Sequence, residues 1–426
     1  MGERITVVGG GSTYTPELID GLARHADLLQ LDELVLVDPD AQRLAIVGGM
    51  AQRMLARAGW TGRLVTFGDL DAGLDGASTV LVQLRIGGQA ARAIDESLPH
   101  ACGCIGQETT GAGGFAKALR TVPVMLDIAE RMAVRAAPGA WLVDFTNPVG
   151  IVTRALLDEG HRAIGLCNVA IGMRKAFAAM LGVPSDAVRL DHVGLNHLTW
   201  IRSVVVDGVD RLPELWRDHR DAIVRRVGVP AALIDDLGVI PSYYLSYFYR
   251  HDQVLAEQRM SPSRAAEVAA IEAELLQLYA DPAVDTKPAL LERRGGAFYS
   301  EAAVELLVSL RTGDGAEHVL NVANGTTIAG LPADCVVEVP CRVDRDGAHP
   351  LACDPLAPEL LGLVQHVTSY EQLTIAAART GSRRIARRAL LAHPLIGQYD
   401  MAEALVEQLL AAHAPSLPRF ANGGGE

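Results

Sequence analysis

A cysteine and a histidine in the middle of the chain could together hold a metal ion. Cys167 ends a short apolar run that begins at residue 163, and His197 follows a second apolar run at 188–195. One amphipathic helix, predicted at 171–181, separates them. A strand–helix–strand segment of this size can bring its two strand ends close together, so a thiolate and an imidazole could share one divalent metal ion. Two residues alone leave open the alternative of a buried cysteine and a capped histidine with no shared role.

A glycine-rich turn near the start of the chain predicts a dinucleotide-binding site. The apolar run at 4–8 predicts a strand, and a helix is predicted soon after the turn that follows it. Gly9 permits a tight turn, and Gly11 lets backbone N–H groups approach a pyrophosphate, which the N-terminus of the helix also attracts. Ser12 and Thr13 belong to the same turn and are candidate cofactor contacts.

An acidic residue closes the second strand of this unit. Asp38 follows the apolar run at 34–37 and would accept hydrogen bonds from ribose hydroxyls, so the pattern favours NAD over NADP. Tyr14 stands where the usual fingerprint has its third glycine, but strand, helix, second strand and acid come in the required order. A purely structural glycine turn stays the alternative.

Strands continue to alternate with helices, which predicts an α/β fold with a Rossmann-type doubly wound parallel sheet. We expect a dinucleotide-binding domain at 1–165 and an α+β catalytic lobe at 166–420. The strand at 198–206, a strand–turn–strand at 319–340 and a helical region at 365–412 belong to this lobe, and the helical region is assigned to packing or a subunit interface. In the first domain the expected helices are 41–58 and 119–137, and the expected strands are 64–67, 79–84 and 141–145.

Polar side chains follow two of the predicted parallel strands, at the edge where ligands bind in folds of this type. Arg85 and Arg92 come after one strand, and Glu108 lies in the glycine-containing loop, 106–114, that follows them. Thr146 and Asn147 come directly after the other. Glu108 and Thr146 are candidate cofactor contacts, and Asn147 is a candidate contact to substrate or nicotinamide. Solvated salt bridges for the arginines and a turn role for Asn147 stay open.

Four of the nine tyrosines of the chain fall within 243–249, in the stretch IPSYYLSYFY. Most clusters of this kind pack their rings and extend their hydroxyls to polar partners. An arginine pair that includes Arg294 lies beside a glycine turn farther along the chain, in LERRGGAFYSEAA.

The composition excludes several classes of function. A net charge of −13 over 426 residues argues against a nucleic-acid or anionic-membrane partner. No apolar run approaches the roughly 18 residues that span a bilayer, and the first residues lack a secretory signal. Six cysteines at irregular positions favour a reduced, cytoplasmic protein over a disulfide framework.

Taken together, several ordered stretches resemble glycoside hydrolase family four and, within it, the 6-phospho-β-glucosidases. The similarity covers nearly the whole chain, and many matches in the correct order are more specific than any single motif. The matching stretches include VVGGGSTYTPELIDGL, LVQLRIGGQAARAIDESL, IGQETTGAGGFAKALRTVPV, FTNPVGIVTRAL, GLCNVAIGMRKA, GLNHLTW, IPSYYLSYFY, RRGGAFYSEAA and GLPADCVVEVP.

The resemblance implies a fold like that of lactate and malate dehydrogenases and an exception to two-carboxylate glycoside hydrolysis. NAD would take hydride from C3 of the sugar, and a divalent metal, usually manganese, would stabilise the resulting enolate. A tyrosine base would remove the C2 proton, the aglycone would leave by elimination, water would add, and the hydride would return. No pair of catalytic carboxylates is evident in the sequence, which agrees with this chemistry.

The resemblance also implies roles for individual residues. Cys167 and His197 match the metal ligands, and Tyr244 matches the base, with Tyr243 as the second choice. Asn147 and Asn168 match positions that hold sugar hydroxyls, and Asn168 is typical of the β-specific branch. The candidates for binding the sugar phosphate through planar guanidinium groups are Arg85, Arg92 and Arg294.

Two positions depart from the family pattern. Ala170 stands where many β-specific members have proline, and Ser246 stands where an arginine is common, which weakens the case for a complete phosphate pocket. A glycosidase of the same mechanism on unphosphorylated glucosides is therefore an alternative, as is an oxidoreductase like malate or lactate dehydrogenase. A silent NAD sensor is a third alternative. The expected partner is a small phosphorylated sugar, and the expected assembly is a homodimer or homotetramer.

Overall fold

Six parallel strands in the order β3-β2-β1-β4-β5-β6 form the core of a nine-stranded sheet. The computed structural model describes residues 2–295 and 298–421. Three antiparallel strands from later in the chain, β11, β12 and β13, continue the sheet beyond β6. The predicted doubly wound sheet is confirmed. Its strands are β1 Glu3–Val8, β2 Leu31–Val37, β3 Arg63–Phe67, β4 Thr79–Val82, β5 Trp141–Asp144, β6 Ala163–Gly165, β11 Glu317–Ala323, β12 Val336–Asp344 and β13 Gly347–Pro350.

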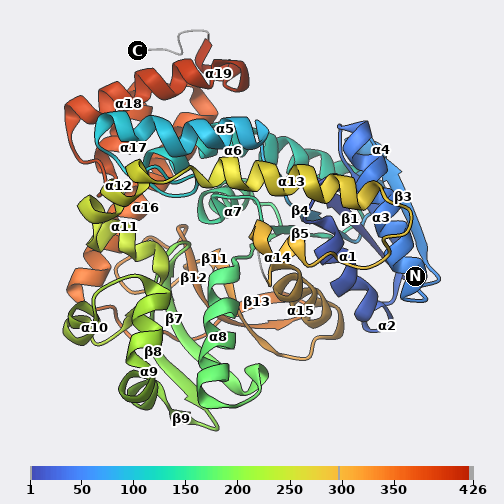
Figure 1. Cartoon of the computed structure of the whole chain (residues 1–426), viewed down its shortest axis with the longest axis horizontal. Coiled ribbons are helices and arrows are strands. Elements are labelled where there is room, and N and C mark those ends of the chain that lie inside the picture. Colours follow the sequence, from blue (N-terminus) through green and yellow to red (C-terminus); the bar gives the residue numbers. More distant parts are fainter. Residues whose placement is uncertain (1, 296–297, 422–426) are drawn as a thin grey trace.

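Helices cover both faces of this sheet (Figure 1). Right-handed crossovers that run in opposite directions from the central strands place their helices on opposite faces. Accordingly α1 packs beside α3, while α4, α6 and α7 form a second group. Helix α13 contacts both α3 and α5 and lies across the molecule in Figure 1. The helices of the first part are α1 Thr15–Arg24, α2 Ala26–Leu29, α3 Ala41–Arg57, α4 Leu70–Leu74, α5 Gly88–Ser97, α6 Gly111–Arg135 and α7 Val149–Asp158.

The central strands are apolar on both faces because helices bury both. Ile5 and Val7 of β1 and Val80 and Leu81 of β4 are at most 1% exposed. Each such side chain contributes about 1.5–3 kcal/mol when it is fully buried. This is why these strands read as continuous apolar runs in the sequence.

The chain turns sharply where β1 ends beside β4. Gly9 has a φ of +87°, and a Cβ there would lie 2.6 Å from the carbonyl oxygen of Gln83. Only glycine fits this left-handed and crowded position. The turn lies at the switch point between β1 and β4, where ligands bind in doubly wound sheets.

A second, smaller sheet carries the histidine of the predicted metal pair. Strands β7 (Val188–Leu195) and β8 (Leu198–Val206) form an antiparallel hairpin with the bounds predicted from the sequence, and β9 (Val209–Asp210) and β10 (Ile240–Pro241) pair with β8. Helix α8 (Asn168–Leu181) leads from β6 to this sheet. The division into domains at 1–165 and 166–420 stays a prediction, since β11–β13 from the later part of the chain join the first sheet.

The predicted start of one helix was wrong. Helix α6 begins at Gly111 rather than near 119, so Gly111, Gly113 and Gly114, which were expected in a loop, form its first turn. A Cβ at Gly113 would lie 2.3 Å from the carbonyl oxygen of Gln107. These glycines therefore serve close backbone packing, which a sequence pattern does not distinguish from a flexible loop.

The later helices complete the lobe. Helix α16 packs on α6 and α7, and α17 and α18 follow it. The helical region, which was predicted from 365, begins at Pro358, the first residue of α16. Among residues 2–295 and 298–421, no helix is long and apolar enough to cross a membrane. The remaining helices are α9 Leu212–Val227, α10 Ala231–Leu237, α11 Ser246–Tyr249, α12 His251–Met260, α13 Arg264–Ala280, α14 Leu290–Arg294, α15 Tyr299–Thr312, α16 Pro358–Thr380, α17 Arg383–Ala392, α18 Tyr399–Ala412 and α19 Pro418–Ala421.

Candidate active site

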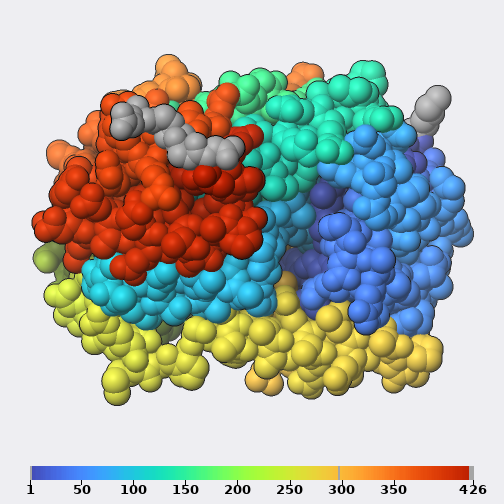
Figure 2. All heavy atoms as spheres, turned by 90° about the horizontal axis from the view of Figure 1, so that it is seen from above, coloured from blue at the N-terminus to red at the C-terminus, as the bar shows by residue number. Residues whose placement is uncertain are grey.

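One cavity of about 440 Å³ lies at the carboxyl edge of the parallel strands and brings most of the predicted site residues together. Seen from above, the molecule is hollowed between its blue and its cyan-to-green segments (Figure 2). Cys167 and His197 are both buried, at 3% and 5% exposure. The predicted residues that line the cavity are Ser12, Arg85, Arg92, Glu108, Asn147, Asn168, Tyr243, Tyr244 and Arg294.

The glycine turn is fixed to the acid that follows β2. The backbone N–H of Gly11 donates to Asp38 Oδ2 at 3.0 Å, and the N–H of Asp40 donates to Asp38 Oδ1 at 3.0 Å. A Cβ at Gly11 would lie 2.8 Å from Asp38 Oδ2. Arg43, which the sequence reasoning missed, donates from Nε to the carbonyl oxygen of Gly11 at 3.2 Å. A carboxylate and a guanidinium thus lie beside the position expected for the adenosine ribose.

Thr13 and Thr146 hold the ends of the parallel strands and their neighbours in place. Thr13 Oγ1 accepts a hydrogen bond from Arg294 Nε at 2.7 Å. The Thr146 hydroxyl accepts from the N–H of Leu84 at 3.1 Å and donates to the carbonyl oxygen of Val82 at 3.2 Å. Both threonines are buried. Their side chains therefore already serve the fold, and their contact with a cofactor stays a prediction.

Glu108 is the centre of a buried group of charges. Lys117 Nζ lies 2.8 Å from Glu108 Oε2, Arg85 pairs with the same oxygen, and Arg92 Nε lies 3.3 Å from Oε1. Burial opposes ionisation of Glu108, but Lys117, Arg85 and Arg92 hold its pKa well below the usual range. Burial lowers the pKa of Lys117 to about 8. Arg92 also contacts Glu96 at 2.6 Å, so three cations share two carboxylates on this wall.

The three predicted phosphate ligands line one cavity but each is already paired. Arg85 and Arg92 contact Glu108, and Arg294 contacts Glu272 at 2.9 Å. A phosphate group would have to compete with these carboxylates or bind to the guanidinium N–H groups that the carboxylates do not occupy. A guanidinium group has five N–H donors, so pairing with one carboxylate does not use them all.

Cys167 is the N-cap of α8 and its thiol is surrounded by hydrogen-bonding groups. The backbone of Val169 and the side chains of Asn196 and Tyr299 hydrogen-bond to it. Burial, together with the charge of Glu338, raises the pKa of Cys167 to about 12. The thiol is therefore protonated unless a cation stabilises the thiolate.

The ring of His197 presents one particular nitrogen as a ligand. Thr109 Oγ1 donates its proton to Gln107 Oε1 at 2.8 Å, so it accepts from His197 Nδ1 at 3.0 Å. Burial lowers the pKa of His197 to about 4, so the ring is neutral and Nε2 keeps its lone pair. A neutral imidazole held by a hydrogen bond on its other nitrogen is the usual metal-binding form.

A divalent metal fits these residues as an open site. In the described part of the chain, no three His, Cys, Asp or Glu side chains gather as a closed site would need. Among the same residues, the Asn147 side-chain oxygen is buried and has no hydrogen-bond partner. A thiolate and an imidazole with open positions left for substrate oxygens match a catalytic rather than a structural centre.

Tyr244 is the cavity tyrosine that lies against the metal pair. Its ring stacks on His197 with centroids 3.7 Å apart, whereas Tyr243 is 39% exposed and stacks on Tyr244 at 4.5 Å. Burial raises the pKa of Tyr244 well above its usual value, and the charges of Tyr243 and Cys167 raise it further. A cation nearby would favour the phenolate. Tyr14, Tyr247 and Tyr299 complete the lining of tyrosines.

Comparison with known proteins decides the family. The model "Family 4 glycosyl hydrolase" matches residues 4–183, and the model of its C-terminal domain matches residues 192–396. A "Probable 6-phospho-beta-glucosidase" of Bacillus subtilis is 38% identical, and the match covers 99% of this chain and 98% of that protein. This chain belongs to family 4 of the glycosyl hydrolases.

Solved structures agree with this membership. The 6-phospho-beta glucosidase of Thermotoga maritima, solved with manganese, NAD+ and glucose-6-phosphate, superposes on this family 4 chain with a TM-score of 0.91 and 33% identity. That match covers 97% of this chain and 99% of the other. The lactate dehydrogenase of Cryptosporidium parvum, at 15% identity, has a TM-score of 0.56 over 88% of this chain and 98% of its own. The second likeness shows the fold alone.

Several residues of this family 4 site were missed in the sequence. Lys117 could have been noticed, since it is one of three lysines in the chain. Asn196 directly precedes His197, and Tyr299 and Glu338 lie within matching stretches, but no local pattern assigns them a role. Their partners come from other elements. Only the fold shows that Asn196 and Tyr299 reach Cys167.

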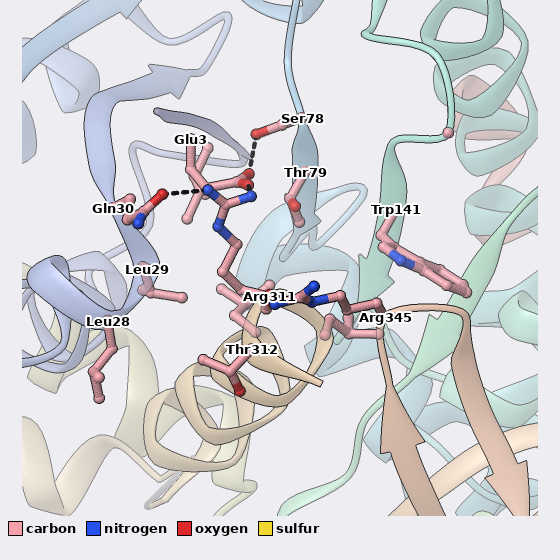
Figure 3. Close-up of a pocket in the computed structure, with 14 residues that line it drawn as sticks. Glu3, Leu28, Leu29, Gln30, Ser78, Thr79, Trp141, Arg311, Thr312 and Arg345 are labelled. Carbon is pink, nitrogen blue, oxygen red and sulfur yellow. Dashed lines mark hydrogen bonds and ion pairs between the residues drawn. The ribbon is translucent and has the colours of Figure 1, made fainter. Parts of the chain in front are cut away.

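A larger cavity, of about 670 Å³, lies at the opposite edge of the sheet (Figure 3). Glu3 and Thr79 line it from the starts of β1 and β4. Arg311 points into it and is paired with Glu3 and Gln30. Among its described lining residues, none is a predicted site residue of the family 4 chemistry. The cavity beside the tyrosines is therefore the candidate active site.

Proposed function

We propose that this chain is a cytoplasmic 6-phospho-β-glucosidase that depends on NAD and a divalent metal, with Mn²⁺ as the expected ion. One observation carries the proposal: Tyr244 stacks on His197 and lines a cavity that Ser12 of the glycine turn and the three predicted arginines also line. The relatives support the substrate, since the B. subtilis protein carries this activity in its name. The T. maritima structure holds manganese, NAD+ and glucose-6-phosphate.

The residues of the chain divide the work of binding. Bound NAD would supply a hydride acceptor, and a bound divalent metal would supply a Lewis acid for a sugar carbonyl. The glycine turn and the N-terminus of α1 lie at the position expected for the pyrophosphate, and Asp38 would accept from the ribose hydroxyls. Cys167 and His197 Nε2 hold the metal. Asn147 and Asn168 hold the sugar hydroxyls at the same end of the cavity.

Tyr244 removes the proton from C2 of the sugar. A proton next to a carbonyl carbon is acidic enough for a tyrosine base that lies within hydrogen-bond reach. The stacking on His197 sets the phenol beside the ring that binds the metal. Elimination of the aglycone from C1, addition of water at C1 with return of a proton to C2, and return of the hydride to C3 would then complete hydrolysis without a second catalytic carboxylate.

Arg85, Arg92 and Arg294 bind the 6-phosphate in this proposal. The cavity wall around Glu108 carries three cations (Arg85, Arg92 and Lys117) and two carboxylates (Glu108 and Glu96). Its net charge is therefore positive and attracts an anion. Bidentate guanidinium contacts would give the phosphate its orientation.

One observation favours a second candidate, a glycosidase of the same mechanism on unphosphorylated glucosides. All three arginines already contact carboxylates, and Ser246 stands where the family commonly has an arginine. The Ser246 hydroxyl donates to the carbonyl oxygen of Tyr243 at 2.7 Å and so serves the local turn.

The chain acts as a homodimer or homotetramer in this proposal. Leu391 and Tyr399, at the end of α17 and the start of α18, are 42% and 56% exposed. Both lie in the helical region that the sequence assigns to packing or a subunit interface.

The deciding experiment compares p-nitrophenyl β-glucoside with its 6-phosphate in the presence of NAD and Mn²⁺. Each reaction is repeated without either cofactor, and absorbance at the NADH band is followed. Cleavage of the phosphorylated substrate at a far higher rate than that of the plain glucoside, lost when NAD or Mn²⁺ is withheld and without accumulation of NADH, is the expected result. Cleavage of the plain glucoside at a comparable or higher rate would favour the second candidate. Stoichiometric NADH would instead indicate a net dehydrogenase.

A further inference from the structure

We infer that Glu338 is a positioning residue that orients Asn196, and through it the sulfur of Cys167, for metal binding. The inference rests on the proposed metal site and adds a residue that contacts neither metal nor substrate. It comes from a buried hydrogen-bond cluster behind the cavity, in which one carboxylate joins the nine-stranded sheet to the smaller sheet.

The carboxylate of Glu338 on β12 accepts three hydrogen bonds. His192 Nε2 on β7 donates to Oε1 at 2.9 Å. Asn196 Nδ2, in the turn between β7 and β8, donates to Oε2 at 2.8 Å, and Asn321 Nδ2 on β11 donates to the same oxygen at 3.1 Å. Glu338 and His192 are 1% exposed and Asn321 is fully buried. Charge-assisted hydrogen bonds in such surroundings are short and strong.

These contacts fix which way the Asn196 amide points. An amide has a donor end and an acceptor end of nearly the same shape. Only the N–H end can face the Glu338 carboxylate, since the amide oxygen would be repelled by it. The Asn196 side chain also lies near Cys167, where as a donor it lowers the pKa of the thiol against the larger effect of burial. A second N–H of the same amide is therefore available to the sulfur, and an inverted amide would present oxygen in its place.

The same cluster fixes the backbone that carries the second metal ligand. Asn196 directly precedes His197, which has a left-handed φ of +63°. Asn321 pairs in the sheet with Gly165, two residues before Cys167. A Cβ at Gly150 of α7 would lie 3.2 Å from Cβ of Asn196. Glu338 thus reaches the segments of both proposed ligands, as outer-shell partners of metal sites commonly do.

The test measures metal binding to the full chain rather than turnover. Glu338→Gln keeps the size of the side chain but no longer dictates the direction of the Asn196 amide. We expect its affinity for Mn²⁺, measured by competition with a chelating dye, to fall about 10- to 100-fold. Its NAD affinity should stay as in the unmodified protein, and its thermal unfolding should stay cooperative while the midpoint falls, because three buried charge-assisted hydrogen bonds are weakened. With Co²⁺ as the probe, the thiolate-to-cobalt charge-transfer absorption should weaken or shift.

Glu371→Gln is the matched control, because Glu371 is a second buried carboxyl group, 4% exposed, near Asn196 but without a contact to its amide. Its Mn²⁺ affinity should be unchanged. The double variant Glu338→Gln/Asn196→Ala should bind Mn²⁺ no more weakly than the weaker single variant, since both act through one contact.

Three results would overturn the inference. Glu338→Gln could bind Mn²⁺ as tightly as the unmodified protein, or it could lose NAD and Mn²⁺ affinity together, which indicates a general structural role. If Glu338→Gln does not fold, Asn196→Ala decides: unchanged Mn²⁺ affinity refutes the inference, and a fall of about tenfold supports it. Cys167→Ser distinguishes a failure of this inference from a failure of the proposed metal site. If the Mn²⁺ affinity of Cys167→Ser is unchanged, Cys167 does not bind the metal and the proposed site is wrong.

Discussion

The ring of Tyr244 lies flat against the ring of His197, with centroids 3.7 Å apart and planes inclined by 11°. The histidine is neutral, and its Nδ1 is occupied by Thr109. The tyrosine thus lies on the face of a ring whose other nitrogen, Nε2, remains for a metal. This arrangement joins the proposed base and the proposed metal ligand in one rigid unit, so a change in either should be felt by the chemistry at C2 of the sugar.

Replacing Tyr244 with phenylalanine tests the base. The ring and its stacking remain while the hydroxyl is lost, so we expect kcat to fall about 10²- to 10⁴-fold with NAD binding retained. Exchange of the C2 proton with deuterated solvent, followed by mass spectrometry of the product, should be lost as well. Tyr243→Phe is the matched control and should keep both. The reverse result would assign the base to Tyr243.

Replacing Asp38 tests the preference for NAD. Its carboxylate accepts from Gly11 N–H, and Arg43 lies against the same glycine. Asp38→Ala removes the charge that repels a 2′-phosphate and leaves Arg43 to attract it, so NAD should bind more weakly and NADP more tightly. Fluorescence titration with both cofactors measures the change. Adding Arg43→Ala should abolish the gain in NADP affinity. If the ratio of the NAD affinity to the NADP affinity is unaltered in Asp38→Ala, Asp38 does not bind the ribose.

Glu371 predicts a pH dependence of stability. Burial raises its pKa to about 8 in the folded chain, against about 4.3 in an unfolded chain. The folded state therefore binds the additional proton between these values, and the stability tied to it is lost as pH rises from about 4.3 to about 8 and changes no further above that. Glu371→Gln cannot ionise, so its free energy of unfolding in urea should fall less than that of the unmodified protein over this interval. Parallel pH profiles of the two proteins would show that Glu371 is not the group responsible.

The sequence predicted what depends on local pattern and missed what depends on distant partners. The bounds of β7 and β8, the glycine turn after β1 and the position of Asp38 after β2 followed from apolar runs and glycine spacing. The start of α6 at Gly111 did not, because glycines that pack closely read as a loop. Glu338 and Asn196 are 142 positions apart, and no periodic pattern connects them. Similarly, Glu108 was expected near the cofactor, and its pairing with Lys117 appears only once α6 is in place.

Arg294 offers the sharpest test of phosphate recognition. Its guanidinium donates to Thr13 Oγ1 and Glu272 Oε1 and lines the cavity. A hydrogen bond to a charged group is worth about 1.5–3 kcal/mol, so Arg294→Gln should lower kcat/KM for the phosphorylated glucoside by about 10- to 100-fold.

The plain glucoside provides the internal control for this change, since it lacks the phosphate and its slow cleavage should not depend on Arg294. Glu272→Gln is the informative counterpart, because it removes the carboxylate that competes for the same guanidinium. Glucose 6-phosphate, measured as a competitive inhibitor, should bind to that variant at least as tightly as it binds to the unmodified protein. If Arg294→Gln instead lowers activity on both substrates to the same degree, the arginine acts by holding the glycine turn through Thr13, and the phosphate must be bound by Arg85 and Arg92 alone.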